Sequence, residues 1–284
     1  MNTFDGKVAA ITGAGSGMGR SLALHLAREG CEVAVSDIDE VGLAETVKQV
    51  SGARVTSQRL DVSDRKAVFA WADKVAADHG RCNLIFNNAG VALSATAEET
   101  TPEDFHWIMN INFWGVVNGT QAFLPHLRKS GEGHVVNTSS LFGLIAFPTN
   151  GAYNASKFAV RGYTEALRIE LDMQRAPIGV TCVHPGGIKT RIVRAARVRE
   201  SIEALGIPMS RASRLDEGFK VTAEAAAAVI LDGVRRNQSR VLVGVDARGL
   251  DVVQRLVPQL YQRLLTYAAR RQTEKWAARK ARPA

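Results

Sequence analysis

Short apolar runs rich in β-branched residues alternate along the chain with longer segments in which apolar residues recur at helical spacing. The short runs predict buried strands, and the longer segments predict amphipathic helices. Strands are expected at residues 8–12, 32–37, 54–60, 84–87, 134–139, 179–184 and 240–245. Helices are expected at residues 18–29, 40–50, 65–79, 105–127, 153–174 and 223–235. This order predicts an α/β fold, a Rossmann-type doubly wound parallel sheet of about seven strands with helices on both faces.

The alternation continues without a break to about residue 246, and no low-complexity linker interrupts it. We therefore expect a dinucleotide-binding catalytic domain at residues 1–247 and a helical C-terminal extension at residues 248–284. No stretch approaches the roughly 20 apolar residues of a membrane-spanning helix, and the N-terminus shows no secretory pattern. The three cysteines, Cys31, Cys82 and Cys182, are few and widely spaced. A cytoplasmic protein with reduced thiols is the expectation.

The net charge of +8 is concentrated near the C-terminus. Residues 235–284 contain 12 Lys and Arg against 3 Asp and Glu, whereas residues 1–234 contain 24 against 25. Apolar residues recur there at helical spacing: Leu250, Val253, Val257, Leu260, Leu264 and Tyr267. We favour packing of this stripe on the body or on a second subunit. Peripheral contact with an anionic membrane remains open, because basic amphipathic helices bind such surfaces, and no nucleic-acid partner is expected.

A glycine-rich turn, Thr12–Gly19, joins the first expected strand to the first expected helix. Such a turn presents backbone N–H groups and the positive end of a helix to a pyrophosphate. The common G-x-G-x-x-G fingerprint does not fit here, and the pattern that does is Gly13-x-x-x-Gly17-x-Gly19. The absence of G-K-[ST] argues against a P-loop ATPase or GTPase. A dinucleotide site is therefore favoured over a flexible turn that binds nothing.

Asp37 ends the second expected strand, 18 residues after Gly19. A carboxylate there accepts hydrogen bonds from ribose hydroxyls and repels a 2′-phosphate, so NAD is expected rather than NADP. Arg20 is the exception to the lack of basic residues near the turn. A solvated loop acid is the alternative, since Asp39 and Glu40 lie beside Asp37.

Tyr153 and Lys157 stand four residues apart in an expected helix, and thus on one face. A cation about 4 Å from a phenol, at an effective dielectric constant of ~20, favours the phenolate by about 4 kcal/mol. Such a cation would lower the tyrosine pKa toward a useful range. Ser140 follows an expected strand and Asn112 lies inside an expected helix, where asparagine often signals local hydrogen bonding. Taken singly, each also fits an ordinary role: a helix face, a loop serine, or a core or kink residue.

Together these motifs resemble the short-chain dehydrogenase/reductase family. The resemblance covers about residues 5–245, and Ser140 precedes Tyr153 by 13 residues, which is similar to the family's spacing. The motifs are Thr12–Gly19, Asp61-Val62, Asn87–Gly90, Asn112, Ser140, Tyr153 with Lys157, and Pro185-Gly186. Met18 stands where isoleucine or leucine is more usual in the family.

The resemblance implies catalytic roles for four side chains. Tyr153 would exchange a proton with the substrate oxygen, which Ser140 would stabilise. Lys157 would lower the tyrosine pKa and bond the nicotinamide ribose, and Asn112 would support a proton relay. No metal is expected, since the six histidines form no ligand motif.

The resemblance also implies a cofactor site. The expected cofactor-binding residues are Gly13, Ser16, Gly17, Met18, Gly19, Asp37, Asp61, Val62, Asn88, Tyr153, Lys157, Pro185, Gly186, Ile188 and Thr190. The glycine turn would hold the pyrophosphate and Asp61 and Val62 would flank the adenine. The backbone of Ile188 and the hydroxyl of Thr190 would hold the carboxamide. A homodimer or homotetramer is implied as well.

The expected reaction is hydride transfer between NAD(H) and a secondary alcohol or ketone, with the hard chemistry supplied by the cofactor. Apolar residues near Ser140 and after Thr190 suggest a hydrophobic substrate, although core packing explains them equally well. They are Leu141, Phe142, Leu144, Ile145, Phe147, Ile192, Val193, Leu205, Ile207 and Met209. The alternatives are a non-catalytic nicotinamide-nucleotide sensor and a membrane-associated protein on the same fold.

Four arginines lie in the same segment, Arg191, Arg194, Arg197 and Arg199. An acidic substrate would explain them. A solvated, mobile lid with Glu200 and Glu203 as counter-charges is the interpretation we favour.

Overall fold

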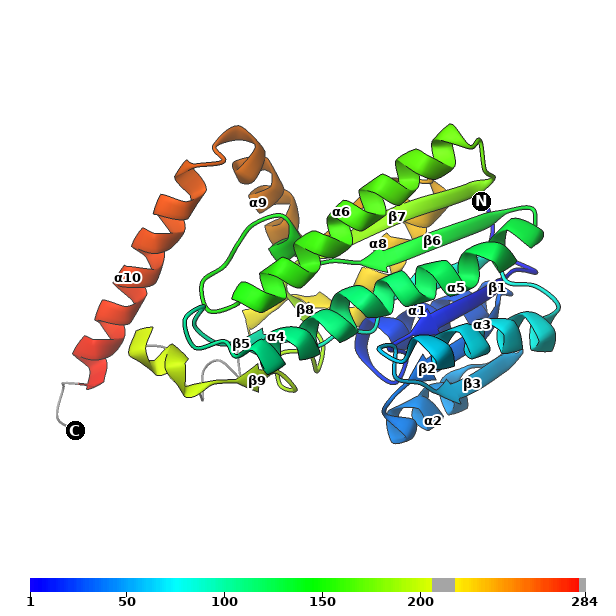
Figure 1. Ribbon diagram of the computed structural model, residues 1–284, viewed down its shortest axis with the longest axis horizontal. Helices are drawn as coiled ribbons and strands as arrows, with labels where there is room; N and C mark the ends of the chain where they lie inside the picture. Colours follow the sequence, from blue (N-terminus) through cyan, green and yellow to red (C-terminus); the bar gives the residue numbers. More distant parts are fainter. Residues whose placement is uncertain (206–217, 281–284) are drawn as a thin grey trace.

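The structure is a computed structural model that describes residues 1–205 and 218–280. Its centre is a seven-stranded parallel sheet with the order β3-β2-β1-β4-β6-β7-β11 (Figure 1). The strands are β1 (Val8–Thr12), β2 (Glu32–Asp37), β3 (Val55–Arg59), β4 (Leu84–Asn87), β6 (Gly133–Thr138), β7 (Ile178–Pro185) and β11 (Arg240–Val243). The order reverses between β1 and β4, and open α/β sheets bind ligands at the carboxyl ends of their strands at such a point. The predicted doubly wound fold is confirmed.

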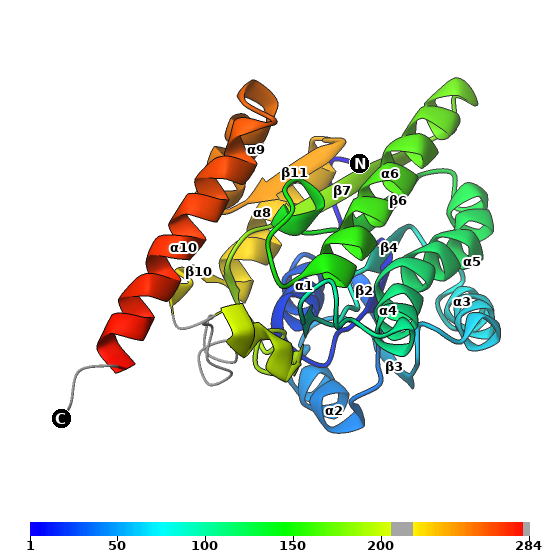
Figure 2. The same ribbon diagram turned by 60° about the vertical axis from the view of Figure 1, so that its left-hand side comes forward.

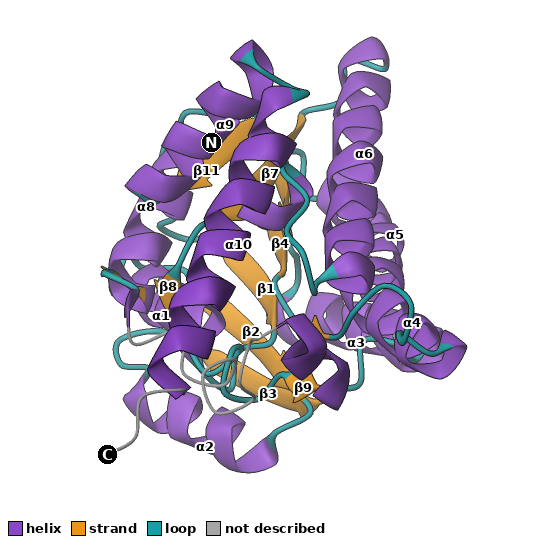
Figure 3. Cartoon of the chain, turned by 90° about the vertical axis from the view of Figure 1, so that its left-hand side faces the viewer, coloured by secondary structure: helices purple, strands orange, loops and turns teal. Residues whose placement is uncertain are grey.

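Helices cover both faces of the sheet, as Figure 3 shows edge-on. One face carries α1 (Gly17–Arg28), α2 (Glu40–Gln49) and α8 (Ala223–Arg235). The other carries α3 (Arg65–His79), α5 (Gly115–Lys129) and α6 (Gly151–Met173). Because successive side chains of a strand point to opposite faces, a sheet covered twice needs continuous apolar strands. This explains the apolar centres of β1, β2 and β4, whereas the edge strand β3, Val55–Arg59, is largely polar.

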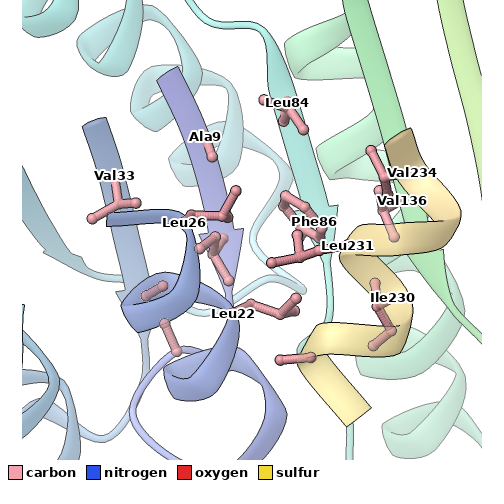
Figure 4. Packing of buried hydrophobic residues seen from close by; sticks show 14 of the residues in the cluster. Ala9, Leu22, Leu26, Val33, Leu84, Phe86, Val136, Ile230, Leu231 and Val234 are labelled. Carbon is pink, nitrogen blue, oxygen red and sulfur yellow. The ribbon is translucent and has the colours of Figure 1, made fainter. Parts of the chain in front are cut away.

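Strand β1 illustrates the two cores. Ala9 and Ile11 face the α1–α8 side, where they join Leu22 and Leu231 (Figure 4). Val8 and Ala10 face the opposite side. There Trp71 of α3 and Phe123 of α5 meet edge to face at 5.1 Å between ring centroids. The rigid sheet between these cores fixes the positions of the loops at its carboxyl edge.

The expectation of one continuous helix over residues 105–127 is wrong. The chain forms α4 (Pro102–Met109), then a π-helical turn, η1 (Asn110–Trp114), and then α5. Asn112 explains the interruption, because its amide bonds the backbone of Val91 in both directions, at 2.8 and 2.9 Å, and donates to the Ser156 hydroxyl at 3.1 Å. These bonds pull the widened turn toward β4 and α6, and such turns frequently mark functional sites.

Four strands of two residues each escaped prediction, since two residues carry no period. Two of them, β8 (Ile188–Lys189) and β10 (Val221–Thr222), pair with each other, and β5 (Leu93–Ser94) pairs with β9 (Arg197–Val198). The β8–β9 segment (residues 188–198) is thus tied at both ends beyond the carboxyl edge of the sheet. A short 3₁₀ turn, η3 (Glu200–Leu205), follows it.

The expectation that Glu200 and Glu203 supply the counter-charges needs correction for Arg197 and Arg199. Arg199 pairs with the buried carboxylate of Asp104 in α4 at 2.7 Å, and Arg197 approaches the same group at 3.5 Å. The Arg197 guanidinium also lies over the Trp107 ring, 3.6 Å from its centroid. The counter-charge therefore comes from α4, where the loss of hydration of Asp104 makes two cations favourable.

The C-terminal residues form α9 (Val245–Leu256) and α10 (Leu260–Lys280), which run along one side of the molecule (Figures 1 and 2). Part of the apolar stripe predicted there packs on the body, and part of it is exposed. Leu250 and Val253 pack on the body, together with the buried Tyr261. Leu260, Leu264 and Tyr267 are instead exposed, by 46, 53 and 56%. Within the described residues, no helix is long and apolar enough to cross a membrane.

Candidate active site

The turn after β1 is built from close contacts that require glycine. Gly13 has a φ of +66°, and a Cβ placed on it would lie 2.7 Å from the Cα of Ala89. A Cβ on Gly19 would lie 2.1 Å from the carbonyl oxygen of Gly13. The turn is therefore folded tightly against the start of α1, in a way that only residues without a side chain allow at these two positions.

A cleft of about 440 Å³ opens in front of this turn. It is lined by nine of the residues expected to bind the cofactor: Gly13, Ser16, Gly17, Met18, Asp37, Asp61, Val62, Asn88 and Thr190. Gly19 lies behind the turn, and Gly186 donates its N–H to the carbonyl of Val243 at 2.9 Å. Pro185 ends β7, and the Ile188 side chain is buried in the core. These last residues shape the loop next to the cleft without lining it.

Asp37 lies at the mouth of the cleft and supports the turn. Its carboxylate accepts hydrogen bonds from the N–H groups of Gly15, at 2.8 Å, and Asp39, at 3.0 Å. The guanidinium of Arg20 does not face the cleft, because it donates to the carbonyls of Gly15 and Gly42 and to the Thr46 hydroxyl. The one basic residue near the turn is thus occupied by the structure that it supports.

The cleft also offers an unused acceptor. The Asn88 amide nitrogen donates to the carbonyls of Thr12 and Gly13, at 3.2 and 3.3 Å, whereas its Oδ1 is buried without a partner. Buried polar atoms are usually satisfied. The glycine turn and the unpartnered oxygen fit a polar ligand such as a nicotinamide dinucleotide.

The four expected catalytic side chains converge from three elements. Tyr153 and Lys157 lie one above the other in the first turns of α6, with Lys157 Nζ 5.7 Å from the centroid of the Tyr153 ring. Ser140 lies near enough to Tyr153 to lower the pKa of its phenol. Lys157 is 3% exposed, and its ammonium donates to the Thr138 carbonyl at 3.1 Å. A Cβ on Gly90 would lie 3.2 Å from Asn112 Oδ1 and 3.3 Å from Lys157 Nζ. Asn112 Oδ1 and Lys157 Nζ, the two atoms that the expected proton relay would connect, therefore both lie next to Gly90.

The acid–base properties differ from the expectation that Lys157 lowers the Tyr153 pKa. Burial of the phenol raises the pKa of Tyr153, and the hydrogen bond from Ser140 opposes this only in part. Burial also lowers the pKa of Lys157 to about 8. In the protein alone, burial thus favours the neutral phenol of Tyr153 and the neutral amine of Lys157, because few polar groups replace the water that these side chains lose.

The residues expected to line the substrate site lie in different environments. Phe142 stacks on Phe147 at 5.2 Å and meets the Tyr153 ring edge to face at 6.1 Å. Ile192 lines the cleft, and Leu205 is exposed. Leu141, Leu144, Ile145 and the partly buried Val193 fit core or loop packing, the first three against α9 and α10. Ile207 and Met209 lie outside the described residues.

Sequence reasoning missed Trp107, Asn110, Ile111 and His184 at the site. Trp107, Asn110 and Ile111 line the cleft from the end of α4 and from η1, and the π-helical turn that places them gives no periodic signal. His184 of β7 contacts the Ser140 carbonyl through Nδ1 at 3.0 Å. Its position at the end of a strand, beside the motif Pro185-Gly186, was the available signal. Within the described residues, no cluster of three metal-ligating side chains occurs.

Comparison with known proteins places this geometry in context. The family model described as short chain dehydrogenase matches residues 7–201. SadH of Mycobacterium tuberculosis, a protein named as an oxidoreductase, is 50% identical over 268 residues, which cover 93% of this chain and 96% of that protein.

Solved structures agree. A short chain dehydrogenase/reductase from Burkholderia phymatum in complex with NAD is 33% identical, with a TM-score of 0.84 over 92% of this chain and 97% of that one. An alcohol dehydrogenase from Thermococcus sibiricus, complexed with 5-hydroxy-NADP, is 26% identical, with a TM-score of 0.68 over 84% and 94%. The fold, the tyrosine–lysine helix and these similarities lead to one conclusion: the chain is an oxidoreductase that belongs to the short-chain dehydrogenase/reductase family.

Proposed function

We propose that this protein transfers a hydride between NAD(H) and a hydrophobic secondary alcohol or ketone. The observation that carries the proposal is the position of the buried Lys157 ammonium, 5.7 Å from the Tyr153 ring centroid and against Gly90, which lines the cleft. The Ser140 hydroxyl is close enough to act on the Tyr153 phenol. Two adjacent hydroxyls, of which one is able to exchange a proton, are what an alcohol oxygen needs as it becomes a carbonyl.

Each side chain has a distinct task in this mechanism. The nicotinamide, when bound, supplies the hydride acceptor or donor. Ser140 holds the substrate oxygen, and Tyr153 Oη takes its proton during oxidation or returns it during reduction. Lys157 stabilises the phenolate, and Asn112 holds the neighbouring backbone in place through its bonds to Val91. Positioning of the reacting atoms provides most of the remaining acceleration.

NAD is proposed as the preferred cofactor. Asp37 supports this choice, since it lines the cleft and would repel a 2′-phosphate. Arg20 cannot offset that repulsion while its guanidinium bonds the turn and α2. The NAD bound in the similar Burkholderia phymatum structure is in accord, although the Thermococcus sibiricus relative carries an NADP derivative.

A hydrophobic substrate is proposed because of Phe142 and Phe147. Their rings stack on one another, and Phe142 also contacts the ring of Tyr153, so apolar surface lies next to the reacting oxygen. Cyclic or long-chain alcohols would gain from the burial of this surface, at about 25 cal/mol per Å². Small polar sugars would not.

The test is the rate of NAD and NADP reduction with a panel of secondary alcohols, for the wild type and for Tyr153→Phe. Turnover with NAD that disappears in Tyr153→Phe, and that favours apolar alcohols, supports the proposal. Binding of NAD without turnover on any alcohol or matching ketone would favour a nucleotide sensor instead. Greater activity on sugars than on cyclic or long-chain alcohols contradicts the substrate class.

We propose a homodimer or homotetramer working in the cytoplasm. Large apolar side chains exposed on α4, η1 and α6, namely Phe105, Trp114 and Ile169, support self-association. The free thiols of Cys31, Cys82 and Cys182 suit a reducing compartment. Sedimentation velocity would give the number of subunits. Peripheral membrane contact through α10 is a separate hypothesis, whose test is given in the Discussion.

A further inference from the structure

The cleft contains more acidic than basic side chains, although the dinucleotide proposed to bind there is itself negatively charged. Its described lining contains two carboxylates, Asp37 and Asp61, and one basic side chain, that of Arg191. The diphosphate of a bound dinucleotide adds about two negative charges to the same space. Since like charges in a shared cleft repel each other, a cation within reach of the diphosphate would strengthen binding.

The end of α1 has been left open for an anion. Its first turn contains no acidic residue, and the hydroxyl of the N-cap residue Ser16 makes no capping hydrogen bond. By contrast, α2, α4 and α8 each have a side-chain cap and an acidic residue in the first turn. The N-terminal N–H groups of α1 and the Ser16 hydroxyl thus remain available to phosphate oxygens.

Arg191 lines the same cleft as this helix end. It follows Thr190, whose Cγ2 would lie 3.1 Å from a Cβ on Gly17, so the chain passes over the turn in close contact. The side chain of Arg191 is exposed and lines the cleft. Arg197 and Arg199 are different, because they do not line the cleft and their guanidinium groups are engaged by Asp104 and, for Arg197, by the Trp107 ring.

The β8–β9 segment holds Arg191 in place at both ends. The β8–β10 pair fixes it just before Thr190, and the β5–β9 pair fixes it again at Arg197. Arginine suits the position, since its planar guanidinium bonds two phosphate oxygens at once. We propose that Arg191 binds the diphosphate of the dinucleotide from the side opposite the glycine turn. This inference rests on the proposed function, which assigns a dinucleotide to the cleft.

Equilibrium titration with adenosine, AMP, ADP, NAD and NADP tests the assignment, using the full chain. The variants are Arg191→Gln, which removes the charge, and Arg191→Lys, which keeps it without the planar fork. Lys189→Gln is the matched control, since it removes a charge from an exposed side chain two residues away that does not line the cleft. Thermal unfolding of each variant checks that it folds.

We expect Arg191→Gln to weaken ADP and NAD about tenfold, in line with the loss of one charge-assisted bond to phosphate. Adenosine binding should not change, Arg191→Lys should fall between, and Lys189→Gln should match the wild type. The difference between wild type and Arg191→Gln should shrink as salt is added.

Three results would overturn the assignment: equal weakening of adenosine, no weakening of ADP, or a loss confined to NADP, which would make Arg191 a 2′-phosphate ligand. A wild type that binds neither ADP nor NAD would instead remove the proposed function itself. The two failures are therefore distinguishable.

Discussion

Ser139 donates its hydroxyl hydrogen to the backbone carbonyl of Lys157, 2.8 Å away. This bond ties the end of β6 to the second turn of α6. Ser140, one residue later, accepts a hydrogen bond from the Phe142 N–H at 3.1 Å and lies near enough to Tyr153 to lower the pKa of its phenol. Two consecutive serines thus have different tasks, because one holds the catalytic helix in place and the other faces the substrate side.

Substitution of the two serines should separate these tasks. Ser140→Ala should lower kcat by roughly 10²–10³-fold, the usual cost of losing a donor to a developing oxyanion. Ser139→Ala should instead lower the free energy of unfolding by about 1 kcal/mol, because a buried hydrogen bond is lost. Steady-state kinetics and urea unfolding of both variants provide the measurement. Similar kinetic defects in the two variants would contradict the division.

Lys157 should limit stability at neutral pH. Burial lowers its pKa to about 8 from an ordinary value of 10.5, so the folded state disfavours the ammonium. Between about pH 8 and pH 10.5 the unfolded chain binds more protons than the folded one, and the free energy of unfolding therefore rises with pH. Lys157→Met should remove this dependence. It should also raise the free energy of unfolding at pH 7 by on the order of 3 kcal/mol, at 1.36 kcal/mol per pKa unit.

The measurement is urea unfolding of wild type and Lys157→Met from pH 7 to pH 10.5. The gap between them should close as the pH rises, while the variant has lost its turnover. A gap that stays constant with pH would show that packing, and not the buried charge, separates the two proteins.

The sheet was predictable because both of its faces are buried. Val8–Thr12 is an almost continuous apolar run, Glu32–Asp37 has an apolar centre at residues 33–35, and the limits of both strands match those expected. The break in the helix after α4 was not predictable, since a π-helical turn depends on bonds between Asn112 and Val91, a partner distant in the sequence.

The candidate site shows the same division. Spacing alone placed Tyr153 above Lys157 and the glycine turn beneath the cleft. The environment of those groups needed the fold, because the desolvation that shifts the Lys157 pKa comes from several packed elements. The partner of Arg199 was also hidden, since Asp104 lies on a different helix and reads in the sequence as an ordinary first-turn acid.

Asp37 should determine which cofactor is used. Asp37→Asn keeps an acceptor for the Gly15 N–H and removes the charge that repels a 2′-phosphate. We expect kcat/KM for NADP to rise about tenfold relative to that for NAD, which corresponds to about 1.4 kcal/mol. Asp37→Ala should add a loss of stability, because the Gly15 N–H then lacks its partner. An unchanged ratio in Asp37→Asn would contradict a charge-based preference.

The exposed face of α10 should bind anionic membranes. Leu260, Leu264 and Tyr267 form an apolar stripe on the side of the helix that does not face the body, and Arg263 and Arg271 are exposed beside it. A basic helix with such a stripe gains both from apolar burial and from attraction to anionic lipid. Wild-type protein should therefore sediment with vesicles of phosphatidylcholine and phosphatidylserine, and less so as salt is added.

Leu264→Asp should reduce the fraction of protein bound to vesicles about tenfold. The substitution replaces an apolar side chain that would enter the membrane with a negative charge that anionic lipid repels. Val252→Asp is the control, because Val252 is similarly exposed, by 52%, but lies on α9. Equal loss in the two variants would mean that net charge alone drives binding. If the wild type does not sediment with vesicles at low salt, the stripe is instead a contact for a second subunit. Sedimentation velocity would then detect the loss of that subunit contact in the Leu264→Asp variant.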